Sequence, residues 1–130
     1  MYNHRLLVID DAIIHRKILC RVGEKAGFDT TEAGSFDEAA RLLHDKEFDC
    51  ITLDLSLGDR AGVEVLSLLS VNKCRVPIII ISGVVEEKNK QRATASGAVA
   101  FFPKPVNFDE MIKVIRATLS ADAGPPPVAA

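Results

Sequence analysis

The sequence predicts an α/β domain in which five helices cover a doubly wound parallel sheet of five strands. Three observations lead to this fold class. Apolar runs alternate five times with helix-like segments along the chain. Three of these runs consist almost entirely of Ile, Leu and Val, which is typical of strands covered by helices on both faces. The 130 residues, 48% of them apolar, are enough for one buried core.

The five apolar runs are the expected strands, joined by right-handed crossovers. They cover residues 6–9, 28–33, 50–53, 77–81 and 99–102. The second run, Phe-Asp-Thr-Thr-Glu-Ala, is more polar than runs one, three and four, so it is expected at an edge of the sheet.

The first helix is predicted from apolar residues that recur every four positions after the first strand. These are Ile14, Ile18, Val22 and Ala26, and they are expected to face the core. Gly27 is expected to end this helix, because glycine readily adopts the conformation that follows a helix C-terminus.

Capping residues and inward-facing side chains define the other helices. Ser35 with Glu38 is expected to form a capping box for the second helix, and Asn107 to cap the fifth, residues 108–119. The expected inward residues are Ala39, Leu42 and Leu43 in the second helix, Gly62, Val65, Leu66 and Leu69 in the third, and Met111, Ile112, Ile115 and Leu119 in the fifth.

The fourth helical segment, residues 86–96, differs because its only apolar side chains are Ala93 and Ala95. Gly97 is expected to end it. A helix with so little apolar surface packs weakly, so we expect it among the more mobile elements.

Composition and charge argue against several classes of protein. A net charge of −2 gives no reason to expect nucleic-acid binding, and no apolar stretch approaches the length of a membrane span. The N-terminus lacks signal-peptide architecture, so a cytoplasmic location is expected. Residues 1–122 are interpreted as one domain, and residues 123–130 as a flexible tail or linker stub.

The cysteines and histidines show no metal-ligand or redox spacing. Cys20, Cys50 and Cys74 are expected to be reduced thiols. His15 falls one helical turn after Asp11 and could reach the rim of a nearby site, but a solvated surface position is the expectation.

Charged and polar side chains follow four of the expected strands. They are Asp10, Asp11, Asp54, Ser82 and Lys104. Because the carboxyl ends of parallel strands meet at one edge of the sheet, we expect these side chains to share a pocket. Two unit charges about 4 Å apart repel by on the order of 4 kcal/mol at an effective dielectric constant near 20. A proton or a divalent cation among the carboxylates would relieve this repulsion.

Mg²⁺ is the expected cation, since an all-oxygen cluster suits it and no cysteine or histidine joins the set, which disfavours zinc. A carboxylate beside bound Mg²⁺ can attack phosphorus and form an aspartyl phosphate. Lys104 can then pair with one phosphoryl oxygen, and Ser82 can donate a hydrogen bond to another. Taken singly, the aspartates could instead cap a helix or lie in a loop, and the lysine and serine could be loop and turn residues.

With these residues in place, the chain resembles the receiver domain of two-component response regulators from about residue 5 to residue 119. The resemblance rests on four motifs in the family's order and spacing. They are Leu-Leu-Val-Ile-Asp-Asp, Ile-Thr-Leu-Asp-Leu-Ser-Leu-Gly with Gly62 eight residues past Asp54, Ile-Ile-Ile-Ile-Ser-Gly, and Phe-Phe-Pro-Lys-Pro. The resemblance implies a flavodoxin-like sheet with strand order 2-1-3-4-5.

The resemblance also implies the roles of the site residues. Asp54 matches the phosphoacceptor, Asp11 the direct Mg²⁺ ligand, and Asp10 the acid that acts largely through water. Ser56 matches the position whose backbone carbonyl completes the metal shell. Lys104 matches the lysine that binds the phosphoryl group, and its peptide bond to the following proline is expected to be cis.

For signalling, the resemblance implies a switch. Ser82 matches the switch hydroxyl and Phe101, nineteen residues later, the aromatic residue whose rotamer follows it. Phosphorylation would draw Ser82 inward and let Phe101 turn in, altering a surface made by the fourth helix, fifth strand and fifth helix. The expected partners are a sensor histidine kinase or phosphotransfer protein, and an output partner on this surface.

Three residues depart from the family pattern. Gly58 replaces a common proline after the phosphoacceptor, and Ala61 stands where an acidic residue is common. Pro103 precedes Lys104 where an aliphatic residue is usual, and it removes a backbone donor at the end of the fifth strand. None of the three deletes a catalytic group.

The chain is therefore expected to accept a phosphoryl group on Asp54, catalysing its own phosphorylation and dephosphorylation without metabolic turnover. The alternative is an interaction module of the same fold that works without phosphorylation, and the intact acidic pocket argues against it. A haloacid-dehalogenase-like phosphatase would have an Asp-x-Asp pair after the first strand, where this chain has adjacent aspartates. A flavin-binding role is disfavoured because no glycine-rich or hydroxyl-rich phosphate loop follows the first strand.

Overall fold

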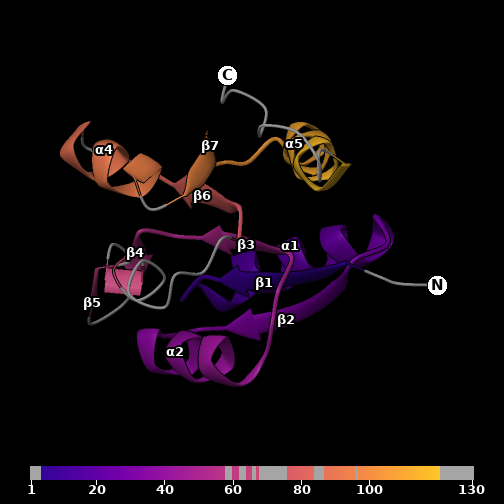
Figure 1. Ribbon diagram of the computed structural model, residues 1–130. Helices are drawn as coiled ribbons and strands as arrows, with labels where there is room; N and C mark the ends of the chain where they lie inside the picture. The colour runs from indigo at the N-terminus through magenta and orange to yellow at the C-terminus, as the bar shows by residue number, and fades with distance from the viewer. Residues whose placement is uncertain are drawn as a thin grey trace.

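The computed structural model describes residues 4–57, 60–61, 64–65, 67, 76–83, 87–95 and 97–120. Five parallel strands form the central sheet (Figure 1). They are β1 Arg5–Ile9, β2 Asp29–Ala33, β3 Cys50–Leu53, β6 Ile78–Ser82 and β7 Ala98–Pro103. Their order is β2-β1-β3-β6-β7, which is the implied 2-1-3-4-5 order because β6 and β7 are the fourth and fifth strands of this sheet. The polar strand β2 lies at an edge, as predicted.

Two further short strands are additions that the sequence analysis did not predict. β4 (Ser56–Leu57) and β5 (Arg60–Ala61) pair antiparallel, shortly after the end of β3. Their signal in the sequence is the Gly-Asp pair at residues 58–59, since two such residues between short strands are typical of a hairpin.

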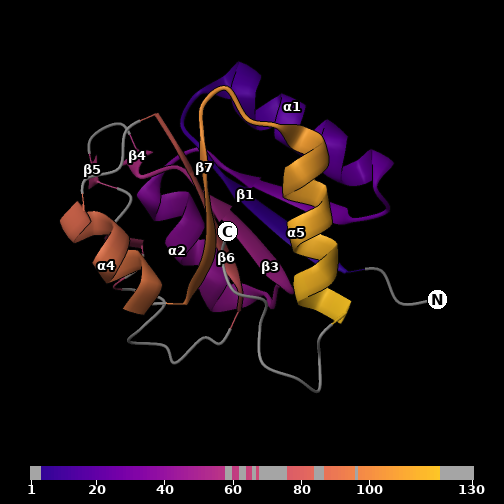
Figure 2. The same ribbon diagram turned by 90° about the horizontal axis from the view of Figure 1, so that it is seen from above.

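Four helices of at least nine residues lie within the described residues. They are α1 Ile13–Lys25, α2 Phe36–Asp45, α4 Glu87–Ala95 and α5 Phe108–Ser120. Figure 2 shows α1 and α5 on one face of the sheet and α2 and α4 on the other. In the third predicted helix, Glu64, Val65 and Ser67 are helical and Val65 is fully buried. The other inward residues predicted there, Gly62, Leu66 and Leu69, lie outside the described residues. No described helix is both long and apolar enough to cross a bilayer.

The core consists of two apolar layers, one on each face of the sheet. Along β1, Leu6 and Val8 pack on the side of α1 and α5, whereas Leu7 and Ile9 pack on the side of α2 and α4. Successive side chains of a strand point to opposite faces, so both faces of this strand must be covered. All four residues are at most 1% exposed, which is what the continuous apolar run predicted.

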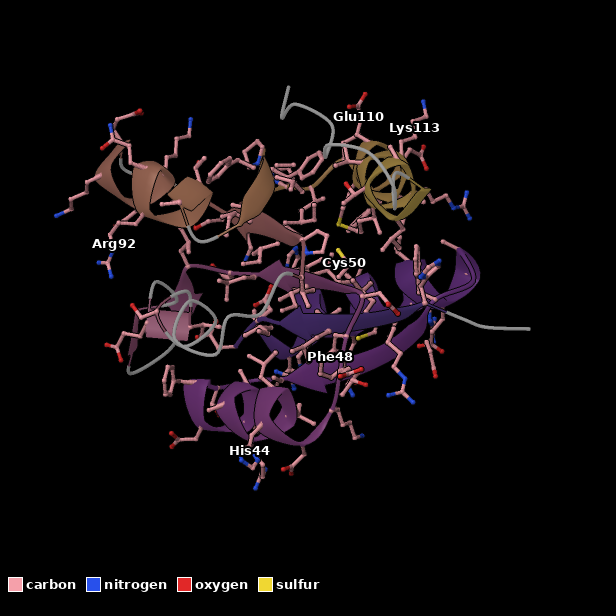
Figure 3. All side chains as sticks on the ribbon, viewed as in Figure 1. His44, Phe48, Cys50, Arg92, Glu110 and Lys113 are labelled. Carbon is pink, nitrogen blue, oxygen red and sulfur yellow. The ribbon has the colours of Figure 1, made fainter. Side chains whose placement is uncertain are left out.

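Two cysteines lie in these layers as buried, free thiols. Figure 3 shows Cys50 on the side of the sheet that faces α5 and Phe48 on the side that faces α2. Burial raises the pKa of the Cys50 thiol to about 12, and burial together with the charge of Glu32 raises the pKa of Cys20. Both thiols are therefore protonated near neutral pH, and their being free agrees with the predicted reduced state. Cys74 lies outside the described residues.

The inward face predicted for α1 was partly wrong. Ile14 and Ile18 are 77% and 42% exposed, and the buried residues of the helix are Leu19, Cys20 and Gly23. A helix turns by about 100° per residue, so a row of residues four apart drifts by about 40° at each step. Val22 and Ala26, at the end of this row, are partly buried against the core. Ile14 and Ile18, at its beginning, face outward.

Gly23 explains why α1 is rotated in this way. A Cβ atom at this position would lie 3.0 Å from both Leu6 Cδ2 and Thr30 Cγ2. The helix therefore approaches β1 and β2 most closely at Gly23, and the residues on the same side become its buried face.

The inward faces predicted for α2 and α5 are confirmed. Ala39, Met111 and Ile115 are fully buried. Leu42, Leu43, Ile112 and Leu119 pack partly buried against the core. In α4 the buried residue is Ala93, whereas Ala95 is exposed, so this helix has the small apolar face that its sequence predicted.

The helix boundaries follow the predicted capping signals. Ser35 Oγ accepts a hydrogen bond from the Glu38 N–H at 3.2 Å, and Asn107 Oδ1 accepts one from the Glu110 N–H at 3.1 Å. In the predicted capping box, Glu38 Oε1 accepts from the Gly34 N–H at 3.3 Å, one residue before the Ser35 N–H that a capping box uses. Gly27 follows α1 with φ +96°, a left-handed conformation that favours glycine. At the other end of α1 the cap is Ala12, which has no side chain to accept a hydrogen bond.

Candidate functional site

Backbone hydrogen bonds fix the residues that follow the strands at one edge of the sheet. The Asp10 N–H donates to the Ala33 carbonyl at 3.0 Å, and the Asp54 N–H donates to the Ile9 carbonyl at 2.9 Å. The Lys104 N–H donates to the Ser82 carbonyl at 3.3 Å, immediately after Pro103, which has no N–H to donate. Asp10, Asp54 and Lys104 therefore each extend the hydrogen-bond ladder of the sheet by one step beyond the strands.

The structure brings three carboxyl groups and one ammonium group together at this edge. Lys104 Nζ donates to Asp54 Oδ2 at 2.8 Å and lies 3.5 Å from Asp10 Oδ2. One oxygen each of Asp10, Asp11 and Asp54 lies within 4.8 Å of the others. Asp10 and Asp54 are 1% and 3% exposed, whereas Asp11 is exposed. The cluster thus has two buried carboxyl groups and, at its rim, one exposed carboxyl group.

The charge of Lys104 is retained at this edge. Burial is the largest influence on its pKa and lowers it, but the hydrogen bond and charge of Asp54, followed by those of Asp10, outweigh burial and raise the pKa. Three carboxyl groups against one ammonium group leave an excess of negative charge when all are ionised. Convergent carboxylate oxygens with an open side fit a hard divalent cation that keeps several waters.

A second set of contacts fixes Asp10. Its Oδ1 accepts from the Ala12 N–H at 2.9 Å, and Arg16 Nη1 donates to its backbone carbonyl at 2.9 Å. Arg16 also pairs with Glu32 on the edge strand β2, and Lys17 pairs with the same carboxylate. The hydrogen bonds from Lys17 and then Arg16 lower the pKa of Glu32. Arg16 was not predicted as a site residue, because its only signal in the sequence was a cation on the first helix near the aspartates.

His15 was expected to be solvated, and this expectation was wrong. Its side chain is 20% exposed, and its Nδ1 contacts Asp10 Oδ2. The expectation that no histidine would join the acidic cluster was also wrong, because His15 contacts Asp10 of that cluster. α1 begins at Ile13, three residues after Asp10, and its first turn places His15 against Asp10.

Ser82 and Phe101, the expected switch pair, lie on the neighbouring strands β6 and β7. Ser82 is 3% exposed at the end of β6, and Phe101 is partly buried against the core on the side of α4. Lys90 of α4 lies with its Nζ 5.7 Å from the centre of the Phe101 ring, a contact that adds cation–π attraction. The Lys104–Pro105 peptide is cis, as expected.

The loop after Asp54 is described in part. Ser56 begins β4, where it pairs with Ala61 of β5, so the backbone of the fourth expected metal-site residue is held in a short ladder. Gly58 lies outside the described residues.

Comparison with known proteins places this geometry in a family. The family model described as response regulator receiver domain matches residues 6–116. The cell cycle transcriptional regulator CtrA of Caulobacter vibrioides is 35% identical over 122 residues, which cover 92% of this chain and 52% of CtrA. The chain thus spans about half the length of the curated relatives it matches.

Solved structures of response regulators have the same fold as this chain. The Francisella response regulator 1452 receiver domain matches with a TM-score of 0.82 and 28% identity, over 91% of this chain and 98% of that one. A response regulator of Burkholderia pseudomallei, solved with a phosphorylated aspartic acid, a calcium ion and citrate, matches with a TM-score of 0.79 and 27% identity, over 91% of this chain and 69% of that one. Together with the acidic cluster and its lysine, these matches show that the chain belongs to the receiver domain family of two-component response regulators.

Proposed function

We propose that Asp54 is the phosphoacceptor of this receiver domain and that the residues around it catalyse the transfer. The observation that carries this proposal is the contact between Lys104 Nζ and Asp54 Oδ2, at 2.8 Å, inside a cluster of three converging carboxyl groups. A buried carboxylate beside an ammonium group and a cation site has the two features that phosphoryl transfer requires: a nucleophile and compensation for the charge on the phosphoryl oxygens.

Mg²⁺ is the cation we propose for this cluster. Asp11 and Asp54 would contact it directly, Asp10 would act largely through water, and the Ser56 carbonyl would complete the protein ligands. When bound, the cation neutralises charge on the phosphoryl oxygens. The exposed position of Asp11 on the rim leaves room for the waters that Mg²⁺ keeps.

In the proposed step, a carboxylate oxygen of Asp54 attacks the phosphorus of a phosphohistidine. A new P–O bond forms, the P–N bond breaks, and its electron pair stays on the imidazole of the donor. Lys104 moves from the carboxylate to a phosphoryl oxygen, and the Ser82 hydroxyl donates to another. Dephosphorylation by water returns the carboxylate, so the chain modifies itself and does not turn over a metabolite.

We propose the donor to be a sensor histidine kinase or a phosphotransfer protein. The output would be a changed surface on α4, β7 and α5 that binds a partner, with neither nucleic acid nor membrane contacted by this domain. Residues 1–122 would form the domain and 123–130 a tail or linker, in a cytoplasmic protein. An interaction module that works without phosphorylation is the competing proposal.

Removal of the metal separates these two proposals. We expect incubation with acetyl phosphate and Mg²⁺ to add the mass of one phosphoryl group, and an excess of EDTA to prevent this addition, because the charge of the carboxylates is then uncompensated. Intact-protein mass spectrometry measures the addition. Readdition of Mg²⁺ is the control for damage by the chelator. A chain that gains no mass with Mg²⁺ present supports the competing proposal.

The proposed switch predicts a change in α4. On binding beryllofluoride, which mimics the phosphoryl group, Phe101 would turn inward and change its contact with Lys90 of α4. We expect altered hydrogen exchange of the amides in Glu87–Ala95, measured by mass spectrometry, with the amides of Phe36–Asp45 in α2 as the internal control. Identical exchange of α4 in both states would exclude this switch.

A further inference from the structure

His15 is largely buried at the site, although this burial does not satisfy the hydrogen-bonding capacity of its ring. It lies in the first turn of α1, with its side chain 20% exposed and Nδ1 against Asp10 Oδ2. The second ring nitrogen, Nε2, is buried and has no hydrogen-bond partner among the residues that the structure describes. A buried polar atom without a partner costs free energy, so burial of this ring favours stability less than an apolar side chain would.

The contact with Asp10 fixes the chemistry of the ring. A carboxylate oxygen only accepts hydrogen bonds, so a ring nitrogen that faces it must carry the hydrogen. Nδ1–H of His15 therefore donates to Asp10 Oδ2. Because Nε2 has no described partner, this contact alone orients the imidazole among the described polar groups.

Asp10 is held by donors on both of its oxygens. Oδ1 accepts from the Ala12 N–H at 2.9 Å, and Oδ2 faces His15 and, at 3.5 Å, Lys104 Nζ. In the proposed phosphoryl transfer Lys104 turns to a phosphoryl oxygen. His15 is then the side chain that stays on Oδ2, so together with the Ala12 N–H on Oδ1 it orients this carboxylate throughout the reaction.

We infer that His15 is a positioning residue, which holds the Asp10 carboxylate in the orientation that the cation requires and thereby sets the affinity of the site for Mg²⁺. This inference rests on the proposed function. Removing a hydrogen-bond partner of a direct metal ligand typically changes metal affinity by about 10–100-fold. Because Asp10 is proposed to act largely through water, we expect the effect of His15 at the lower end of this range.

Three substitutions test this role. His15→Leu removes the donor and keeps an apolar side chain of similar reach. His15→Asn keeps a donor, because its Nδ2 can occupy the place of the imidazole Nδ1, whereas the amide of His15→Gln lies one bond farther out, near the place of Nε2. The Mg²⁺ dissociation constant of each full chain is measured from amide chemical shifts during titration, since the chain has no tryptophan to report binding by fluorescence.

We expect Mg²⁺ binding to weaken about 10-fold in His15→Leu and His15→Gln, and to be largely retained in His15→Asn. Unchanged or tighter binding by His15→Leu would overturn the inference. So would equal weakening in His15→Asn and His15→Leu, which would assign the ring a packing role. If His15→Leu does not fold, the Asn and Gln variants are compared instead: weaker Mg²⁺ binding in His15→Gln than in His15→Asn supports the inference, and equal binding overturns it. Failure of the unsubstituted chain to bind Mg²⁺ would instead overturn the proposed function.

Discussion

Asp54→Asn abolishes phosphorylation of the chain by acetyl phosphate and Mg²⁺. An amide nitrogen has no available electron pair to attack phosphorus, and an amide oxygen carries no negative charge for Lys104 to balance. The remaining carboxylates have other contacts: Asp10 is held by Ala12 and His15, and Asp11 lies on the exposed rim. The expected result is no detectable mass gain by intact-protein mass spectrometry.

The matched control is Asp109→Asn, at an exposed position in the first turn of α5. It makes the same chemical change on the same chain, so it should gain the phosphoryl group at the rate of the unsubstituted protein. A cooperative unfolding transition in both variants shows that the loss is chemical. Undiminished phosphorylation of Asp54→Asn would assign the acceptor to another group.

Lys104→Met lowers the rate of phosphorylation by about 100-fold or more and leaves the fold intact. Methionine keeps an apolar stem of similar length and removes the ammonium group that lies 2.8 Å from Asp54 Oδ2. Loss of one donor that stabilises charge in a transition state typically costs about 100–1,000-fold in rate. The time course of mass gain at saturating Mg²⁺ measures this effect.

Lys113→Met is the control for this change. Lys113 is exposed on α5, and Figure 3 shows its side chain pointing away from the sheet. The Lys113→Met variant should therefore be phosphorylated at the rate of the unsubstituted chain. If Lys104→Met also reacted at the normal rate, the role proposed for the ammonium group would be wrong, even if Asp54 were the acceptor.

Much of the sheet could be predicted because its strands carry their own signal. All five main strands begin and end within one residue of the positions that the apolar runs predicted. Once the strands are parallel, the residues after them must gather at one edge. Asp10, Asp54 and Lys104 therefore came together in the prediction without any knowledge of their side-chain geometry.

What could not be predicted depends on contacts between elements. The row Ile14, Ile18, Val22 and Ala26 on α1 was assigned to the core, but α1 packs closest at Gly23, so Ile14 and Ile18 face outward and only the end of the row contacts the core. The same helix orientation accompanies the placement of His15 on Asp10 and Arg16 on the Asp10 carbonyl. A sequence pattern gives the period of a helix and not its rotation about its own axis, so these two contacts needed the structure.

The central claim is that one buried carboxylate, made reactive by a divalent cation and a lysine, receives the phosphoryl group. The most direct test is to locate that group on the chain. Borohydride reduces an aspartyl phosphate to homoserine, with release of phosphate, and tandem mass spectrometry of peptides then identifies the position. After incubation with acetyl phosphate and Mg²⁺, the expected result is homoserine at position 54 alone. Homoserine at another position, or intact aspartate at 54 in a chain that binds Mg²⁺, would contradict the claim.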